Sequence, residues 1–372
     1  MAAIVGSGLR FESPTQMGRL AVDGGAMGRR VDKFVVALAA VAIVSLVNAA
    51  AEGQESRPAA GSARSDTWVP PRGADGHPSL EGVWENNSAT PLERPLQFAD
   101  KPLLTDDELS SLRRRASELF TPESDAIFGD GLYLALLSNA RPHGLGATGT
   151  YSQNWLPDRY FENRTSLIVD PPNGRLPAPT PEGQKARLAA AGRFERPANA
   201  AQEMTITDRC IFYGFPDLFA AYMSVYRIVQ SPQYVAIQME KIHDVRIIPL
   251  DGRPHVSPAL RSYLGDSRGH WDGDTLVVET TNFHPNGNPM GGYSTLSDQN
   301  LRLIERFRRT AADTLEYTFT VDNPTMWTKP WTAVINWKQA RGELYEYACH
   351  EGNYSLPGML TGAQADEAAA SR

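Results

Sequence analysis

The sequence is poor in the short motifs that mark common catalytic centres. It has two cysteines, Cys210 and Cys349, which are too far apart for a thioredoxin-like CxxC pair. No two histidines have HExxH or HxH spacing, and no GxxxxGK[ST] phosphate-binding loop is present. We therefore expect no nucleotide cofactor. Any other cofactor stays open, and so does a metal site assembled from distant histidines and carboxylates.

Long runs of lysine or arginine are also missing. The formal net charge is -7 at pH 7 over 372 residues, whereas proteins that bind nucleic acid usually cluster positive charge. We therefore expect no nucleic-acid partner. With 41% apolar and 21% charged residues, the chain has the composition of a globular protein with material for one large core or two modest ones.

The clearest long apolar run lies near the N-terminus. Basic residues up to Lys33 precede an apolar stretch from Phe34, which ends in small residues at Ala51. This order is typical of a signal peptide, here residues 1–51, and predicts a periplasmic or secreted protein. Because the stretch is near the minimum length for a membrane span, an uncleaved anchor is the alternative. If the signal is cleaved, we expect no stable membrane span. Met27 is an alternative start to Met1.

Export would place both cysteines in an oxidising compartment. There a pair is more often bonded than free, so we predict a disulfide between Cys210 and Cys349. Two buried, unpaired cysteines are the alternative.

Composition divides the rest of the chain into four parts. Residues 52–79 are rich in Gly, Ser, Ala and Pro and read as a flexible linker, and residues 357–372 as a disordered tail. A single domain at 80–356 carries a helical insertion at 105–195. One helix is predicted after Thr105, an N-cap followed by an acidic first turn, and a second from Pro181 to Phe194.

The C-terminal half alternates apolar and polar residues in segments separated by turn chemistry. The predicted strands are 221–230, 234–241, 244–250, 275–283, 301–309, 315–321, 331–338 and 343–350. Pairing in chain order gives an antiparallel meander, which closes most simply into a barrel. We therefore expect a mainly β fold, an antiparallel lipocalin-like β-barrel with two peripheral helices.

The stretch GDSRGHWDGDTLVVETTNF (265–283) combines a turn with candidate site residues. Asp272-Gly273 has the composition of a two-residue hairpin turn, so a structural role in the turn is enough to explain Asp272. Asp266, Arg268 and His270 then remain as residues that a hairpin could present at a barrel rim.

Several motifs carry a family resemblance. Gly82-Val-Trp84 is similar to the G-x-W signature that opens lipocalin and calycin barrels, in which the Trp closes the barrel floor. NRTSLIVDPPNGRLP (163–177), IHDVRIIPLDGRPH (242–255) and the 265–283 stretch resemble those of an uncharacterised family of secreted bacterial proteins, a domain of unknown function, over most of 80–356. This likeness implies kinship and export but no reaction. Unlike a simple lipocalin, the chain places two helices between its G-x-W and the main strands.

Carboxylates at alternating strand positions are candidates for acid–base chemistry. If their faces line the interior, burial would raise their pKa values unless they are paired. The candidate catalytic residues are His270, Glu279, Glu305 and Glu240. The alternative is that each glutamate faces solvent or forms a buried pair with Arg227, Arg246 or Arg306.

Aromatic residues are frequent in and beside the strands. We expect most of them to form the core and the remainder to line a pocket for a small apolar or aromatic molecule. The candidate ligand-binding residues are Arg268, Asp266, Trp271, Arg253, His255 and His243. Small-molecule binding is thus the leading hypothesis. The alternatives are a cofactor-independent isomerase, lyase or hydrolase that uses interior Glu and His, a His/carboxylate metal enzyme, and an interaction module.

Overall fold

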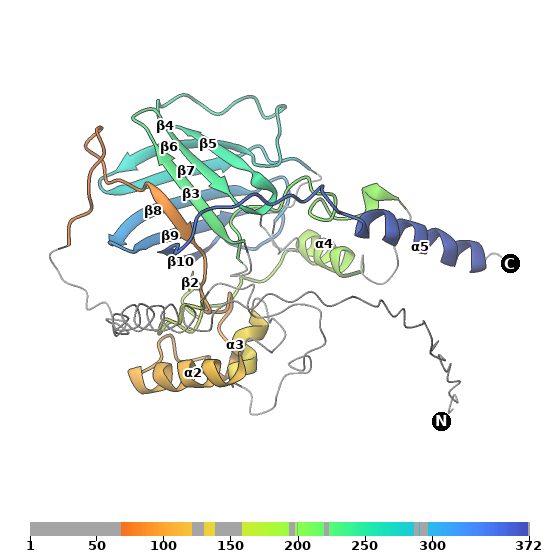
Figure 1. Cartoon of the computed structure of the whole chain (residues 1–372), viewed down its shortest axis with the longest axis horizontal. Coiled ribbons are helices and arrows are strands. Elements are labelled where there is room, and N and C mark those ends of the chain that lie inside the picture. Colours follow the sequence, from red (N-terminus) through yellow and green to blue (C-terminus); the bar gives the residue numbers. More distant parts are fainter. Residues whose placement is uncertain are drawn as a thin grey trace, which may run out of the picture. The chain divides into compact units, whose positions relative to one another are not determined.

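The computed structural model describes most of the chain from Trp68 onward (Figure 1). The described residues are 68–120, 130–137, 158–192, 198, 200–218, 223–285, 290 and 297–370. The strands are β1 (Gly82–Glu85), β2 (Ile168–Asp170), β3 (Val225–Gln230), β4 (Tyr234–Met239), β5 (Val245–Pro249), β6 (Asp266–Asp272), β7 (Thr275–Thr281), β8 (Arg302–Ala311), β9 (Thr314–Asp322) and β10 (Trp331–Gln339). The helices are α2 (Asp106–Leu119), α3 (Asp130–Leu137), α4 (Pro181–Gly192) and α5 (Ser355–Ala370), with 3-10 turns η1 (Leu96–Phe98), η3 (Ala201–Glu203) and η4 (Lys241–His243). The predicted signal peptide, 1–51, lies outside the described residues.

Nine strands form one nearly closed barrel. Their order is β5-β4-β3-β1-β10-β9-β8-β7-β6, and β2 pairs with β10 outside this order. Every hydrogen-bonded pair of neighbours is antiparallel. From β3 to β10 each strand follows its predecessor around the barrel, and β1 lies between β3 and β10. The predicted fold class, an antiparallel meander closed into a barrel, is confirmed.

The barrel has a seam between β5 and β6, where the described strands form no backbone ladder. With an odd number of strands and antiparallel pairs everywhere else, these two end strands run in the same direction. Side chains connect them instead. Arg246 Nη2 of β5 donates to Ser267 Oγ of β6 at 3.2 Å. A Cβ at Gly269 of β6 would lie 2.7 Å from Leu250 Cδ2 and 2.8 Å from Ile248 Cγ2, so a larger residue there would require these side chains to shift.

Aromatic side chains fill the barrel interior. The rings of Tyr226 and Trp337 stack with centroids 4.4 Å apart, and Phe307 stacks on Tyr317 at 4.8 Å. The interior aromatic residues that are at most 2% exposed are Trp84, Tyr226, Phe307, Tyr317, Phe319, Trp331 and Trp337. Most aromatic residues of the strands therefore belong to the core, as expected.

Trp84 of the G-x-W motif packs where β8 ends. Its indole N–H donates to the Leu80 carbonyl at 3.0 Å. The Arg309 guanidinium lies over its ring at 5.3 Å from the centroid, a cation–π arrangement.

Both predicted helices are present. Thr105 accepts a hydrogen bond from the Glu108 backbone N–H while the Glu108 carboxylate accepts one from the Thr105 N–H, which is a capping box at the start of α2. The second, α4, begins at Pro181. The tail expected to be disordered instead forms α5. Pro357 lies in its first turn, where a missing N–H is tolerated, and alanines favour the helix that follows.

Two further expectations need correction. Residues 343–350 form no strand, because β10 is already paired with β9 on one side and with β1 and β2 on the other. The part of the predicted linker that is described, 68–79, packs on the β6–β7 hairpin. There Arg72 pairs with Asp274 at 3.0 Å, and the His77 ring stacks on Trp271 with centroids 4.7 Å apart.

The predicted disulfide between Cys210 and Cys349 is present. It joins the segment before β3 to the segment after β10, across 139 positions of sequence. Over the residues described, no helix has the length and apolar character needed to cross a bilayer.

Candidate functional site

A cluster of polar side chains lies inside the barrel. At its centre the Glu305 carboxylate of β8 is fully buried. It accepts hydrogen bonds from Arg246 Nη2 at 2.6 Å and Nη1 at 2.9 Å, and from the Tyr317 hydroxyl at 2.9 Å. Arg246 Nη2 also donates to Thr280 Oγ1 at 3.0 Å and to Ser267 Oγ at 3.2 Å. These five residues are called the interior cluster.

Charge in the interior cluster is fixed by burial and pairing. Burial acts to lower the pKa of Arg246, but the adjacent Glu305 carboxylate outweighs it and holds the pKa above its ordinary value. Burial also raises the pKa of Tyr317 well above its ordinary value, with a further contribution from Glu305. Arg246 is therefore a cation and Tyr317 a neutral donor at neutral pH. For Glu305, the buried pair with Arg246, one of the interpretations weighed from the sequence, is what the structure shows.

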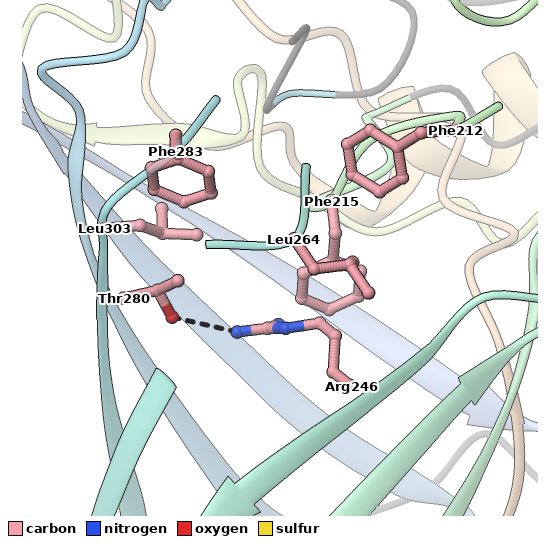
Figure 2. Close-up of a pocket in the computed structure, with 7 residues that line it drawn as sticks. All are labelled: Phe212, Phe215, Arg246, Leu264, Thr280, Phe283 and Leu303. Carbon is pink, nitrogen blue, oxygen red and sulfur yellow. Dashed lines mark hydrogen bonds between the residues drawn. The ribbon is translucent and has the colours of Figure 1, made fainter. Parts of the chain in front are cut away.

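A small pocket adjoins the interior cluster (Figure 2). As the side chains stand, the space between its walls is too small to hold a water molecule. Its lining is apolar apart from two residues of the cluster and consists of Phe212, Phe215, Arg246, Leu264, Thr280, Phe283 and Leu303. Figure 2 shows the Thr280 hydroxyl bonded to the guanidinium, with the aromatic and leucine side chains around it. The pocket therefore presents apolar walls and one buried cation.

Besides strands β5, β7 and β8, three parts of the chain contribute to the pocket walls. Residues 204–218, here called the plug, contribute Phe212 and Phe215. Leu264 comes from the connector, residues 250–265, which joins β5 to β6. Phe283 follows β7. Because β5 and β6 are parallel, the connector must return along the barrel, and this return brings Leu264 to the pocket.

The structure places Glu279 on the outer face of β7. The inward residues of that strand are Leu276, Val278 and Thr280, which are at most 1% exposed, so the expectation of an interior Glu279 is wrong. The sequence permitted either face because Glu279 shares its strand face with Val277 and Thr281, and these residues favour a strand as strongly as those of the opposite face. Of the three candidate glutamates, Glu305 alone lies on an inward face of the barrel strands.

Four predicted residues do meet, but outside the barrel. His255 Nδ1 lies 2.8 Å from Asp266 Oδ2, and its Nε2 lies 3.5 Å from Glu279 Oε1. Arg268 Nη1 pairs with Asp266 at 2.7 Å. Arg302 donates to Glu279, and this hydrogen bond is the main reason that the pKa of Glu279 is lowered. Every charge in this group has a partner, so the network fastens the connector to β6 and β7.

Two other predicted ligand residues have structural partners. Trp271 stacks on His77, and Arg253 pairs with Asp251. Neither residue lines the pocket.

The remaining candidates are dispersed. His270 is exposed on the outer face of β6. Glu240 is buried after β4, where burial raises its pKa and its carboxylate accepts a hydrogen bond from the Tyr345 backbone N–H. His243 ends η4, and its side chain is outside the described part. In the described part of the chain, no three His, Cys, Asp or Glu side chains are arranged to hold a metal ion.

Sequence reasoning gave no site role to Ser267 or Thr280. Gly265-Asp-Ser-Arg-Gly269 has the GxSxG spacing of a nucleophile elbow, and this spacing is the one signal in the sequence that points to Ser267. In the structure Ser267 lies within β6, with Arg246 and Thr280 bonded to its hydroxyl, rather than at a strand-to-helix turn. A second glycine pattern, GLGATG at 144–149, lies outside the described residues.

Comparison of the chain with protein-family models, with curated proteins and with solved structures gives no match.

Proposed function

We propose that the protein binds a small aromatic or apolar molecule of about one ring in the pocket beside Arg246. The observation that carries the proposal is a buried guanidinium, with its side chain 2% exposed, on the wall of a pocket whose other lining residues are Phe, Leu and Thr280. Binding sites for small molecules typically combine apolar walls with a few fixed polar groups. Here the polar groups are Arg246 and Thr280.

The size of the pocket limits the ligand. Drug-sized molecules occupy pockets of roughly 300–1,000 Å³, whereas this pocket has no room for a water molecule until a lining side chain moves aside. Movement of one lining phenylalanine, Phe212 or Phe215, would make room for about one ring. A single ring with one hydrogen-bond acceptor, such as a phenol, therefore suits the pocket better than a lipid or a fused-ring compound.

The geometry favours binding over acid–base catalysis at this place. A general base needs a proton acceptor that can reach the ligand. Glu305 already accepts hydrogen bonds from Arg246, Tyr317 and Thr280, and it does not line the pocket. Its carboxylate is committed to holding Arg246 in position.

We propose that residues 1–51 act as a signal peptide and that the protein works in the periplasm or outside the cell. The Cys210–Cys349 disulfide is compatible with that location, since disulfides persist in oxidising compartments. A pocket of this kind would then take up its ligand outside the cytoplasm.

Calorimetric titration with 4-methylphenol tests the proposal. Leu264→Trp places a larger side chain at the pocket wall, while Leu260→Trp changes an exposed residue of the same connector. We expect wild type and Leu260→Trp to bind with equal affinity and Leu264→Trp to bind at least about tenfold more weakly, a difference of about 1.4 kcal/mol. No binding to wild type, or equal binding by all three proteins, would overturn the proposal.

A further inference from the structure

Phe215 of the plug reaches into the aromatic interior of the barrel. Its ring lies over the Arg246 guanidinium, and Arg246 Cζ is 4.4 Å from the centroid of the Phe215 ring. Its centroid lies 5.9 Å from Tyr226, 5.7 Å from Tyr317 and 6.1 Å from Trp337, with edge-on or tilted contacts. Phe215 is 3% exposed. These four partners, here called the aromatic box, surround the ring as they would surround a bound aromatic molecule.

The plug itself is not a strand of the barrel. It consists of turns and irregular backbone between η3 and β3, and it inserts Phe212 and Phe215 into the end of the barrel. A ring carried on a separate segment can leave the interior without breaking the barrel ladder. The strands that hold Arg246, Tyr226 and Tyr317 would remain paired to their neighbours.

Contacts outside the barrel tether the plug. Cys210 is bonded to Cys349 of the segment after β10. In the same segment, Asn353 Nδ2 donates to the Asp208 carbonyl at 3.0 Å and to Cys210 Sγ at 3.3 Å. The plug is therefore held in the barrel end by a covalent link to the segment after β10 and by the contacts of Phe215 in the barrel interior.

We propose that Phe215 is an internal occupant of the ligand site, and that the plug and an aromatic ligand compete for the aromatic box. The inference rests on the proposed function and extends it to the ligand class. Because the ring lies on the face of a cation, the box favours electron-rich rings such as phenols over saturated rings of the same shape. The ligand binds only to molecules in which the plug has left the aromatic box. The apparent affinity of wild type for the ligand is therefore reduced in proportion to the fraction of molecules in which the box is open.

Replacement of Phe215 and addition of the missing ring test the proposal. Toluene is an analogue of the phenylalanine side chain, of which Phe215→Ala removes the ring, and methylcyclohexane is of similar size but has no π-system. We expect toluene to raise the Tm of Phe215→Ala by more than that of wild type, and methylcyclohexane to raise the Tm of the variant less than toluene does. The matched control is Phe319→Ala, which truncates a fully buried ring that is stacked on Tyr317 but not over a cation. There toluene and methylcyclohexane should have equal effects.

Affinity separates this inference from the function on which it rests. We expect 4-methylphenol to bind Phe215→Ala at least about tenfold more tightly than wild type. Equal affinity of the two proteins would be consistent with ligand binding beside Arg246 but would contradict competition by Phe215. Binding to the variant alone would support the aromatic box and contradict the function proposed for wild type.

Loosening the tether provides a second test that keeps every ring. In Cys210→Ser/Cys349→Ser the plug loses its covalent link but retains Phe215. We expect tighter binding of 4-methylphenol than in wild type, provided that the far-ultraviolet circular dichroism spectrum is unchanged. Should the double variant unfold, Asn353→Ala removes the two hydrogen bonds to the plug and leaves the disulfide in place, with the same expected direction. Folded tether variants that bind no more tightly than wild type would contradict a competing plug.

Discussion

The Arg246 guanidinium of β5 donates two hydrogen bonds to the Glu305 carboxylate of β8, at 2.6 and 2.9 Å. Their side chains are 2% and 0% exposed. Since β5 and β6 form no ladder, this ion pair connects the two sides of the seam through the barrel interior. It also orients the guanidinium toward the pocket.

Replacing one member of the Arg246–Glu305 pair should lower the free energy of unfolding more than replacing both members. Arg246→Met leaves the Glu305 carboxylate buried without its cation, and removal of one member of a buried pair costs about 3–5 kcal/mol. Replacing both residues by apolar ones, Arg246→Met/Glu305→Leu, should recover most of that loss. Urea denaturation gives the free energy of unfolding of each variant.

A surface pair provides the control for that experiment. Arg306 lies 3.5 Å from Asp272, and their side chains are 49% and 68% exposed. Arg306→Ala should therefore change the free energy of unfolding by less than about 1 kcal/mol. If Arg246→Met were no more destabilising than Arg306→Ala, the interior pair would not hold the seam.

Gly269→Ala should destabilise the seam. The added Cβ would lie 2.7 Å from Leu250 Cδ2 and 2.8 Å from Ile248 Cγ2, and overpacking of this kind costs about 1–3 kcal/mol. Gly342→Ala is the matched substitution, because no atom lies within 4 Å of the added Cβ. It should change the free energy of unfolding by about 0.5 kcal/mol or less. Equal effects of the two substitutions would mean that β5 and β6 are not in close contact.

Stability should fall at alkaline pH through the buried tyrosines. Burial raises the pKa of Tyr226 and of Tyr317 well above the ordinary value. Above a pH of about 10 the unfolded chain loses these phenol protons while the folded chain keeps them. The free energy of unfolding therefore decreases as pH rises, by about 1.4 kcal/mol per pH unit for each tyrosine. The contribution is fully present below pH 10.

Tyr317→Phe tests this pH dependence. The variant should lose stability with a shallower slope above pH 10 than wild type, by about 1.4 kcal/mol per unit. Denaturation at several pH values between 9 and 11, chosen around the ordinary tyrosine pKa of about 10, gives both slopes. Parallel slopes would show that Tyr317 ionises equally in the folded and unfolded chains.

The barrel class and its local signals could be predicted from the sequence because each depends on neighbouring residues. The hairpin turn after β6 is an example. Asp272 pairs with Thr275 across the two-residue loop Gly273-Asp274, one residue later than the predicted Asp272-Gly273, and Gly273 has φ +59°, which such turns favour. The capping box at Thr105 is equally local.

The site depends on distant contacts and was predicted only in part. Glu305 was expected inside the barrel because it shares a strand face with Leu303 and Phe307, and Arg246 was one of its possible partners. The outward direction of Glu279 is set by the pairing of β7 with β8. Phe215 reaches the barrel interior on a turn-rich segment. Such a segment has no apolar periodicity, so the sequence does not indicate this position.

His255 should protect the connector from proteolysis. His255→Ala removes the contacts to Asp266 and Glu279, and about 1 kcal/mol of lost hydrogen bonding would raise the open fraction of the connector about fivefold. Limited tryptic digestion after Arg261 measures that fraction. His270→Ala, at an exposed position of β6, should leave the cleavage rate unchanged. Equal rates in both variants would contradict the fastening role of His255.

The position of a bound ring is the most direct test of the central claim. NMR spectra of protein with ¹³C-labelled leucine methyl groups can record nuclear Overhauser effects from the ring protons of 4-methylphenol. We expect these effects at Leu264 and Leu303, which line the pocket, and none at the exposed Leu260. Effects confined to Leu260, or none at any leucine under saturating ligand, would contradict binding beside Arg246.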